Sequence, residues 1–140
     1  NHGCNGGWPS SALKYVQASG LQSESAYPYV ARDQTCKMQG GSYKISSIQT
    51  AAGCNGMINA ITGRPLSITV DATNWSPYRG GVFNNCAGNI NHAVLLVGTD
   101  ASGVWKVKNS WGTGWGESGF IRLAAGNTCG VCTYGGVYVA

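Results

Sequence analysis

The chain has 140 residues, about the length of one domain. Only 10% of its residues are charged, whereas an average soluble domain has roughly 25%. With 22 glycines and six cysteines, the chain is expected to derive its stability from packing, glycine-rich turns and disulfides. The net charge of +4 comes without a run of Lys and Arg, which gives no indication of nucleic-acid binding. No apolar stretch reaches the length of about 18 residues that a membrane span needs, so no membrane partner is expected.

Hydrophobic periodicity and turn residues predict two helices and six strands. The first helix is expected over residues 9–18, because Pro9 favours a helix start and Gly20 favours a stop. Residues 20–38 are expected to be irregular. The second helix is predicted over residues 55–61, and the strands over 43–48, 66–72, 92–98, 104–108, 120–123 and 136–139.

The most informative stretch runs from Asn91 to Gly116. His92 opens an apolar strand, a turn follows at residues 100–103, and Asn109 closes the next strand. Two such strands pair as a hairpin, and their outer ends then lie together, so the two side chains are expected to meet. A carboxamide that accepts one ring N–H fixes the imidazole tautomer, which is the orienting half of a Cys-His-Asn nucleophilic site. His92 and Asn109 are therefore candidate catalytic residues.

Three stretches are distinctive when taken together: GCNGGWP at 3–9, NHA at 91–93 and KNSWGTGWGESGF at 108–120. In this order they resemble the papain-like cysteine proteases, in particular the cathepsin L-like branch. The resemblance implies an α+β papain-like fold, mostly the sheet-rich, barrel-like domain with part of the helical domain. Residues 1–20 would then belong to the helical half and the cleft loop, and residues 21–140 to the sheet-rich half.

The nucleophilic cysteine of this family lies in a Cys-Gly-Ser/Ala-Cys-Trp/Tyr motif, roughly 130–150 residues before the His and Asn. The chain contains no such motif. We therefore expect the nucleophile upstream of Asn1, on an N-terminal part of the same domain or on a separate processed chain. By resemblance, Cys4 and Cys36 would form disulfides with upstream cysteines. The chain alone is expected to be inactive.

The implied activity is that of a cysteine-type endopeptidase. The upstream thiolate would attack the peptide carbonyl, and His92 would protonate the leaving amine and later activate water. Asn109 would orient His92. By resemblance, Trp111 would cover the hydrogen bond between His92 and Asn109, and Trp115 would line the leaving-group side of the cleft. Trp111 follows Asn109 by two residues, so on a strand its side chain would project to the same side.

The resemblance also assigns a substrate cleft. Gly7, with Gly6 beside it, would pair with the substrate backbone, because a residue without Cβ lets another backbone come close. The pocket for the second residue before the scissile bond would have a largely apolar wall, which predicts a preference for Leu, Val or Phe there. Its floor would lie near Gly135. The wall residues are Trp8, Pro9, Thr69, Asn91 and Ala93.

The other four cysteines leave two disulfide maps open. By resemblance, Cys86 pairs with either Cys129 or Cys132, and Cys54 takes the remaining one. A zinc site at Cys129 and Cys132 is not predicted, because the chain has no second pair of ligands at a suitable spacing. No cofactor is expected.

The expected partners are peptide and protein substrates, the N-terminal part of the same domain, and a pro-segment or cystatin-like inhibitor. The resemblance implies a lysosomal or vacuolar location, or secretion. Two other functions stay open at this point: a non-catalytic protease homologue with a replaced nucleophile, and a disulfide-crosslinked binding module.

Overall fold

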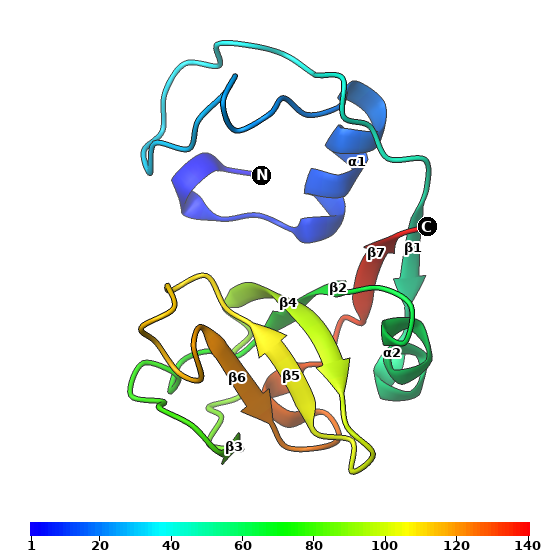
Figure 1. Cartoon of the computed structure of the whole chain (residues 1–140), viewed down its shortest axis with the longest axis vertical. Helices are drawn as coiled ribbons and strands as arrows, with labels where there is room; N and C mark the ends of the chain where they lie inside the picture. Colours follow the sequence, from blue (N-terminus) through cyan, green and yellow to red (C-terminus); the bar gives the residue numbers. More distant parts are fainter. The chain divides into compact units, whose positions relative to one another are not determined.

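The computed structural model describes residues 1–140, which divide by their contacts into two compact units. One unit comprises Asn1–Gln49 with Val139–Ala140, and the other comprises Thr50–Tyr138. Figure 1 shows the elements of both. The assignment of residues 1–20 to a helical half stays a prediction. No helix has the length and apolar character that crossing a membrane requires.

The first unit contains the turn η1 (Gly3–Asn5) and the helix α1 (Pro9–Ser19). The predicted helix is confirmed: Pro9 begins it, and Gly20 ends it with a φ of 82° and an N–H donated to the Val16 carbonyl. Residues 20–38 form no helix or strand apart from one bridge between Leu21 and Tyr43, as expected.

The strand predicted over residues 43–48 is wrong, because strand β1 is Ile48–Ala51. The segment before it makes a different set of bonds. Tyr43 pairs only with Leu21, the Ser46 carbonyl accepts from the side chain of Gln17, and the Ser46 hydroxyl donates to the Ala140 carbonyl. The regular ladder therefore begins only at Ile48.

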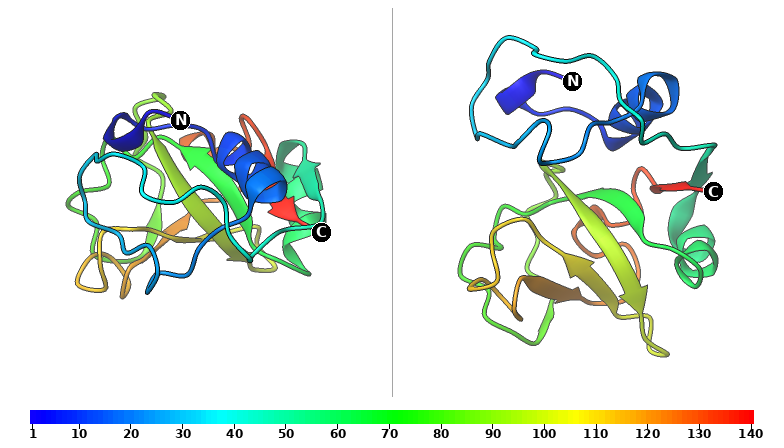
Figure 2. Two further views of the ribbon diagram at one scale, coloured as in Figure 1. Left: turned by 90° about the horizontal axis from the view of Figure 1, so that it is seen from above. Right: turned by 45° about the horizontal axis from the view of Figure 1, so that its top comes forward.

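The sheet has seven strands in the order β1-β7-β2-β4-β5-β6-β3. Neighbouring strands β4, β5 and β6 lie side by side with a marked twist (Figure 1 and Figure 2). The order leaves β1 and β3 as edges, so the barrel-like form implied by the resemblance is not a closed barrel. The strands after β1 are β2 (Leu66–Val70), β3 (Val82–Phe83), β4 (His92–Thr99), β5 (Trp105–Lys108), β6 (Phe120–Leu123) and β7 (Gly136–Val139).

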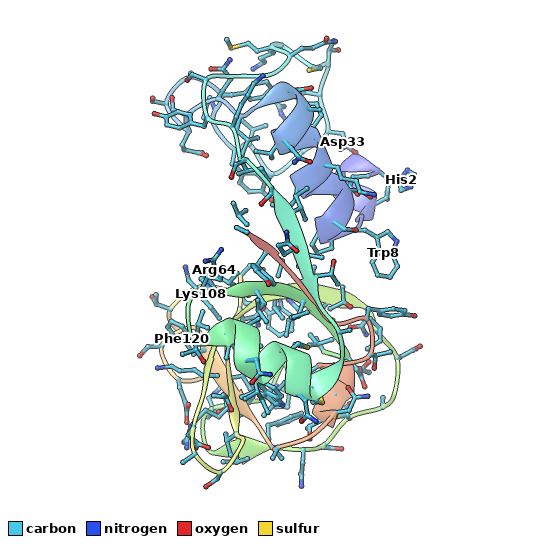
Figure 3. The ribbon with its side chains drawn as sticks, turned by 90° about the vertical axis from the view of Figure 1, so that its right-hand side faces the viewer. His2, Trp8, Asp33, Arg64, Lys108 and Phe120 are labelled. Carbon is cyan, nitrogen blue, oxygen red and sulfur yellow. A yellow bond between two sulfur atoms is a disulfide. The ribbon has the colours of Figure 1, made fainter.

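The core of the second unit lies between this sheet and α2 (Gly53–Ile61), which buries Met57 and Ile61. Burial alternates along β5, since Trp105 and Val107 are buried and the two lysines between and after them are exposed. Lys108 is paired across the strands with Phe120 of β6, and Figure 3 labels both. The short strand β3, which pairs in parallel with β6, was not predicted.

Two disulfides crosslink the second unit. Cys86 is bonded to Cys129, and Cys54 is bonded to Cys132. This is one of the two maps left open by the sequence. The second disulfide ties α2 to the turn η2 region (Thr128–Gly130) that leads into β7.

Candidate active site

The side chains of His92 and Asn109 are in direct contact. His92 is the first residue of β4, and Asn109 follows the last residue of β5, so the antiparallel pairing of these strands brings them to the same end. His92 Nε2 lies 2.8 Å from Asn109 Oδ1. The contact expected from the hairpin is therefore present.

The amide of Asn109 is oriented by a second hydrogen bond. The backbone N–H of Ser110 donates to the same Oδ1 at 2.8 Å, which identifies that atom as the acceptor oxygen. His92 must then donate from Nε2–H, and its Nδ1 is left free to act on a nucleophile. Asn109 is only 8% exposed, and its Nδ2 is buried without a partner. Low exposure strengthens the bond to His92 because water competes poorly there.

Aromatic rings surround His92. Trp111 stacks on the imidazole with a centroid distance of 5.3 Å, and Trp75 meets it edge-on at 6.3 Å. Trp115 packs against both indoles, at 5.1 Å from Trp111 and 6.1 Å from Trp75, and donates its Nε1–H to the Trp75 carbonyl. The His92–Asn109 pair is therefore placed in a largely apolar environment.

Residues 1–138 match the family model for papain family cysteine proteases. The chain belongs to this family. Among curated relatives, it is 47% identical over 134 residues to "Cathepsin L 2" of Paramecium tetraurelia, which covers 94% of the chain and 43% of that relative. It is 38% identical to "Papaya proteinase 4" of Carica papaya, with 99% of the chain and 42% of the relative covered.

Solved structures agree. The cysteine protease of Carica candamarcensis in complex with E-64 matches with a TM-score of 0.90 at 36% identity, over all of this chain and 71% of that one. Digestive procathepsin L 3 of Tenebrio molitor larval midgut matches with a TM-score of 0.87 at 38% identity, over all of this chain and 50% of that one. The predicted papain-like fold is confirmed. The papain-family chain spans less than half the length of these two curated relatives.

One expectation about Trp111 is corrected. It does not continue a strand, because β5 ends at Lys108 and Trp111 lies in a bend. The turn is set instead by the Asn109 N–H, which donates to the Gly119 carbonyl, and by Gly112 with a φ of 85°. Trp111 still reaches His92, with 42% of its surface exposed. Trp115 is buried, and its assignment to the leaving-group side stays a prediction.

Trp75 is the residue at this site that sequence reasoning missed. It follows β2 in an irregular stretch and is completely buried. No local pattern marks it, because its ring partners His92, Trp111 and Trp115 are distant along the chain.

The proposed cleft residues of the second unit lie at the same end of β2 and β4. Thr69 is paired with Ala93 across the two strands, one step from the pair of Val70 and His92. The Thr69 hydroxyl is buried without a partner, and Ala93 is exposed. Asn91 uses its side chain within the chain, accepting from Ala72 N–H at 3.0 Å.

The other residues that were predicted for the cleft belong to the first unit. Gly6 has a φ of 88°, which favours glycine. A Cβ on Gly7 would lie 2.2 Å from Asn1 Oδ1, so this glycine accommodates the close approach of Asn1. Trp8, labelled in Figure 3, is 52% exposed, and Pro9 is half-buried at the start of α1.

Gly135, expected near the pocket floor, packs against the chain itself. A Cβ on this residue would lie 2.4 Å from the carbonyl oxygen of Ala51. Its φ of 69° also favours glycine. The cleft roles of these glycines and of the pocket residues stay predictions.

Proposed function

We propose that this chain supplies the His-Asn part of a papain-like cysteine endopeptidase. The observation that carries the proposal is the 2.8 Å hydrogen bond between His92 Nε2 and Asn109 Oδ1, with Trp111 stacked on the imidazole. This arrangement fixes the ring and leaves Nδ1 available to a thiol. Membership of the papain family supports the same reaction class.

The nucleophile in this proposal is a cysteine other than the two free thiols of the chain. Cys4 and Cys36 are both exposed. A hydrogen bond with the carboxylate of Asp33 raises the pKa of the Cys4 thiol, which disfavours the reactive thiolate. We assign the nucleophile to a segment upstream of Asn1, as the family resemblance implies; the relatives are longer than the region that they share with this chain.

The mechanism then uses His92 twice. With the ring protonated, the imidazolium stabilises the neighbouring thiolate, which attacks the peptide carbonyl and forms a tetrahedral intermediate. As the C–N bond breaks, the Nδ1 proton passes to the leaving amine, and an acyl thioester remains. Neutral His92 next takes a proton from water, which attacks the thioester, and the released thiolate again pairs with imidazolium. Asn109 holds the ring throughout by accepting the Nε2–H bond.

The substrates we propose are peptides and proteins with an apolar side chain at the second position before the scissile bond. The support is the apolar character of the assigned wall, Trp8, Pro9 and Ala93, together with the absence of a charged residue among the assigned positions. A pro-segment is a further proposed partner, since one structural relative is a procathepsin. A lysosomal, vacuolar or secreted location is proposed from family membership.

The test uses the full-length protein with its N-terminal part. We expect cleavage of fluorogenic peptides that carry Leu, Val or Phe at that position, and weaker cleavage of the matched Arg peptide. His92→Ala should lower kcat by about 100-fold or more, as expected for loss of a general acid and base. A folded wild-type protein that cleaves none of these peptides would instead support a non-catalytic homologue. A preference for Arg would overturn the pocket assignment alone.

A further inference from the structure

Asp71 is a buried carboxylate with an unusual set of partners. It follows the last residue of β2 and is only 1% exposed. Its Oδ1 accepts the backbone N–H of Thr73 at 3.0 Å, and its Oδ2 accepts those of Ala87 and Gly88 at 2.5 and 2.6 Å. Acidic residues are rarely buried so fully unless their charge is compensated. Here the compensation comes from backbone N–H groups, so the carboxylate links two separate segments of the chain.

The charge of Asp71 persists in acid. Burial acts to raise the pKa and is the largest single influence, but hydrogen bonds from Thr73, Gly88 and Ala87 together outweigh it. The pKa of Asp71 is consequently lowered to about 2. The carboxylate therefore keeps its acceptor role at neutral pH and throughout the mildly acidic range.

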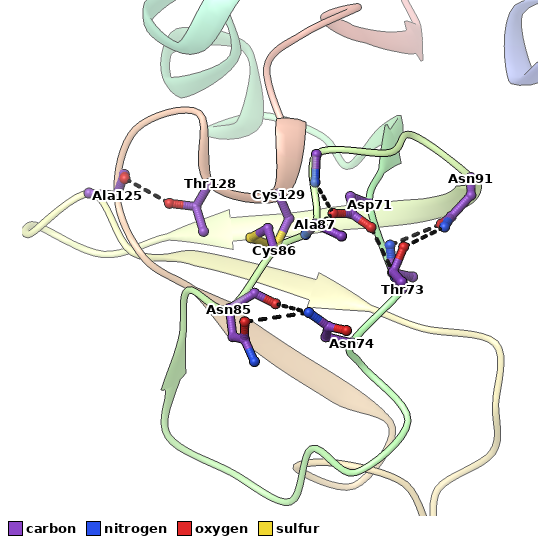
Figure 4. The surroundings of a disulfide bond; sticks show 12 residues. Asp71, Thr73, Asn74, Asn85, Cys86, Ala87, Asn91, Ala125, Thr128 and Cys129 are labelled. Atoms are coloured by element: carbon purple, nitrogen blue, oxygen red, sulfur yellow. Dashed lines mark hydrogen bonds between the residues drawn. A yellow bond between two sulfur atoms is a disulfide. The ribbon is translucent and has the colours of Figure 1, made fainter.

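The segment held by Asp71 leads directly to His92. Residues 84–91 connect β3 to β4, and His92 is the next residue. The far end of this loop is fixed by Asn91, whose N–H donates to the Val70 carbonyl and whose Nδ2 donates to Thr73 Oγ1. In Figure 4, Asp71, which follows β2, reaches Ala87 in the loop. Asn91, at the end of the loop, reaches back to Thr73 in the segment after β2.

Further bonds crosslink this region. Cys86, which directly precedes Ala87 and Gly88 in the loop, forms a disulfide with Cys129. The Asp71 N–H donates to the Cys129 carbonyl at 2.8 Å. Gly88 adopts a φ of 90°, which turns its N–H toward Asp71 Oδ2 alongside that of Ala87. Two consecutive N–H groups on one oxygen form a concave anion-binding arrangement.

We propose that Asp71 is a positioning residue for His92. Val70 is the strand partner of His92, so Asp71 lies one residue beyond the end of the β2–β4 pairing. The β2–β4 ladder ends at His92, and the backbone before it is held by the Asn91 N–H bond to the Val70 carbonyl and, further along the loop, by the bonds of Ala87 and Gly88 to Asp71. Asp71 acts through Ala87 and Gly88 and does not touch the reacting atoms. This inference rests on the proposed endopeptidase function, for which Asp71 would set the position of His92.

Asp71→Asn is the first variant. It keeps the shape of the side chain but replaces one oxygen by an NH₂ group, which cannot accept from a backbone N–H. The loop must then shift to avoid two facing donors. Because a misplacement of about 1 Å can cost a catalytic step about 100-fold, we expect kcat to fall by roughly 10- to 100-fold. KM should change by less than about threefold, since substrate contacts are retained.

Gly88→Ala changes the loop that donates to Asp71 and leaves Asp71 itself unchanged. The Cβ would enter open space, so the variant should fold, but a φ of 90° strains any residue other than glycine. It should lower kcat selectively, as Asp71→Asn does. This variant also decides the proposal if Asp71→Asn fails to fold.

Asp100→Asn is the matched control. The Asp100 carboxylate also accepts two backbone N–H bonds, from Ser102 at 2.8 Å and Val104 at 3.0 Å, but it is exposed and follows the opposite end of β4. Its kcat should match the wild type. If Asp71→Asn and Gly88→Ala lower the melting temperature but leave kcat unchanged, the role of Asp71 is structural only and the proposal is overturned.

A readout without activity separates this proposal from the proposed function. In the full-length protein, amide hydrogen exchange at Ala87 and Gly88 should accelerate in Asp71→Asn, and the ¹⁵N resonances of the His92 ring should move. If the wild type cleaves no peptide, the endopeptidase proposal fails. The exchange rates and the His92 resonances still show whether Asp71 positions His92. Unchanged His92 resonances in Asp71→Asn would overturn it.

Discussion

Replacing Asn109 by Ala removes the one acceptor that orients His92. Oδ1 receives both the Nε2–H of His92 and the N–H of Ser110, each at 2.8 Å, so the substitution frees the ring and leaves one backbone donor unsatisfied. A hydrogen bond to a charged partner is worth about 1.5–3 kcal/mol, and the imidazolium is such a partner. At about 1.4 kcal/mol per tenfold, kcat/KM should fall by roughly 10- to 150-fold.

Two measurements on the full-length protein check this. Steady-state kinetics should show the loss mainly in kcat, and ¹⁵N spectra of the His92 ring should show a mixture of tautomers in place of the Nε2–H form. Asn127→Ala is the matched control, because Asn127 Oδ1 also accepts a backbone N–H, that of Cys132, at 2.8 Å. The reasoning is refuted if Asn109→Ala keeps kcat/KM within about twofold of wild type and retains a single tautomer.

Three further predictions concern ring packing, crosslinking and pH. Trp111→Ala should lower kcat more than Trp111→Phe does, and should destabilise the fold by about 0.5–1.5 kcal/mol for each aromatic pair lost, measured by denaturant unfolding. Replacing Cys54 and Cys132 together by Ser should cost about 2–4 kcal/mol, and an unchanged unfolding midpoint would contradict this. Hydrogen bonds from Arg122 lower the pKa of Glu117 from its ordinary value of 4.5 to about 2. Against the opposing effect of its burial, hydrogen bonds from backbone N–H groups lower the pKa of Asp71 from 3.8 to about 2. The two carboxylates therefore stabilise the fold fully above about pH 4.5, and this stabilisation is lost as the pH falls toward 2. The melting temperature should fall over the same pH range, and it should fall less steeply in a variant with Asp71→Asn and Glu117→Gln.

Local sequence was sufficient for part of the site. Strand β4 begins at His92 and β5 ends just before Asn109, and a short turn joins the two strands. Their pairing and the meeting of their outer ends were therefore predictable from the local sequence. The helix α1 was equally local, because Pro9 and Gly20 mark its ends. The position of Trp111 near His92 came from family resemblance, and β5 ends before Trp111.

The parts of the fold and of the site that could not be predicted depend on contacts between distant segments of the chain. Trp75 joins the site through rings that lie far along the chain, and Asp71 acts through Ala87 and Gly88, so neither position has a local signature. The parallel pairing that creates β3 requires β6 as its partner. The misplaced strand before Ile48 has the same cause, because its polar groups bond to α1 and to the chain end instead of to a neighbouring strand.

Reaction of the full-length protein with E-64, the compound bound in one structural relative, tests the central claim most directly. Intact mass and peptide mapping should show a single adduct on a cysteine other than Cys4 and Cys36, formed about 100-fold more slowly in His92→Ala because the thiolate loses its imidazolium partner. An adduct on Cys4 or Cys36, or an equal rate in His92→Ala, would contradict the assignment of His92 as the residue that activates an N-terminal nucleophile.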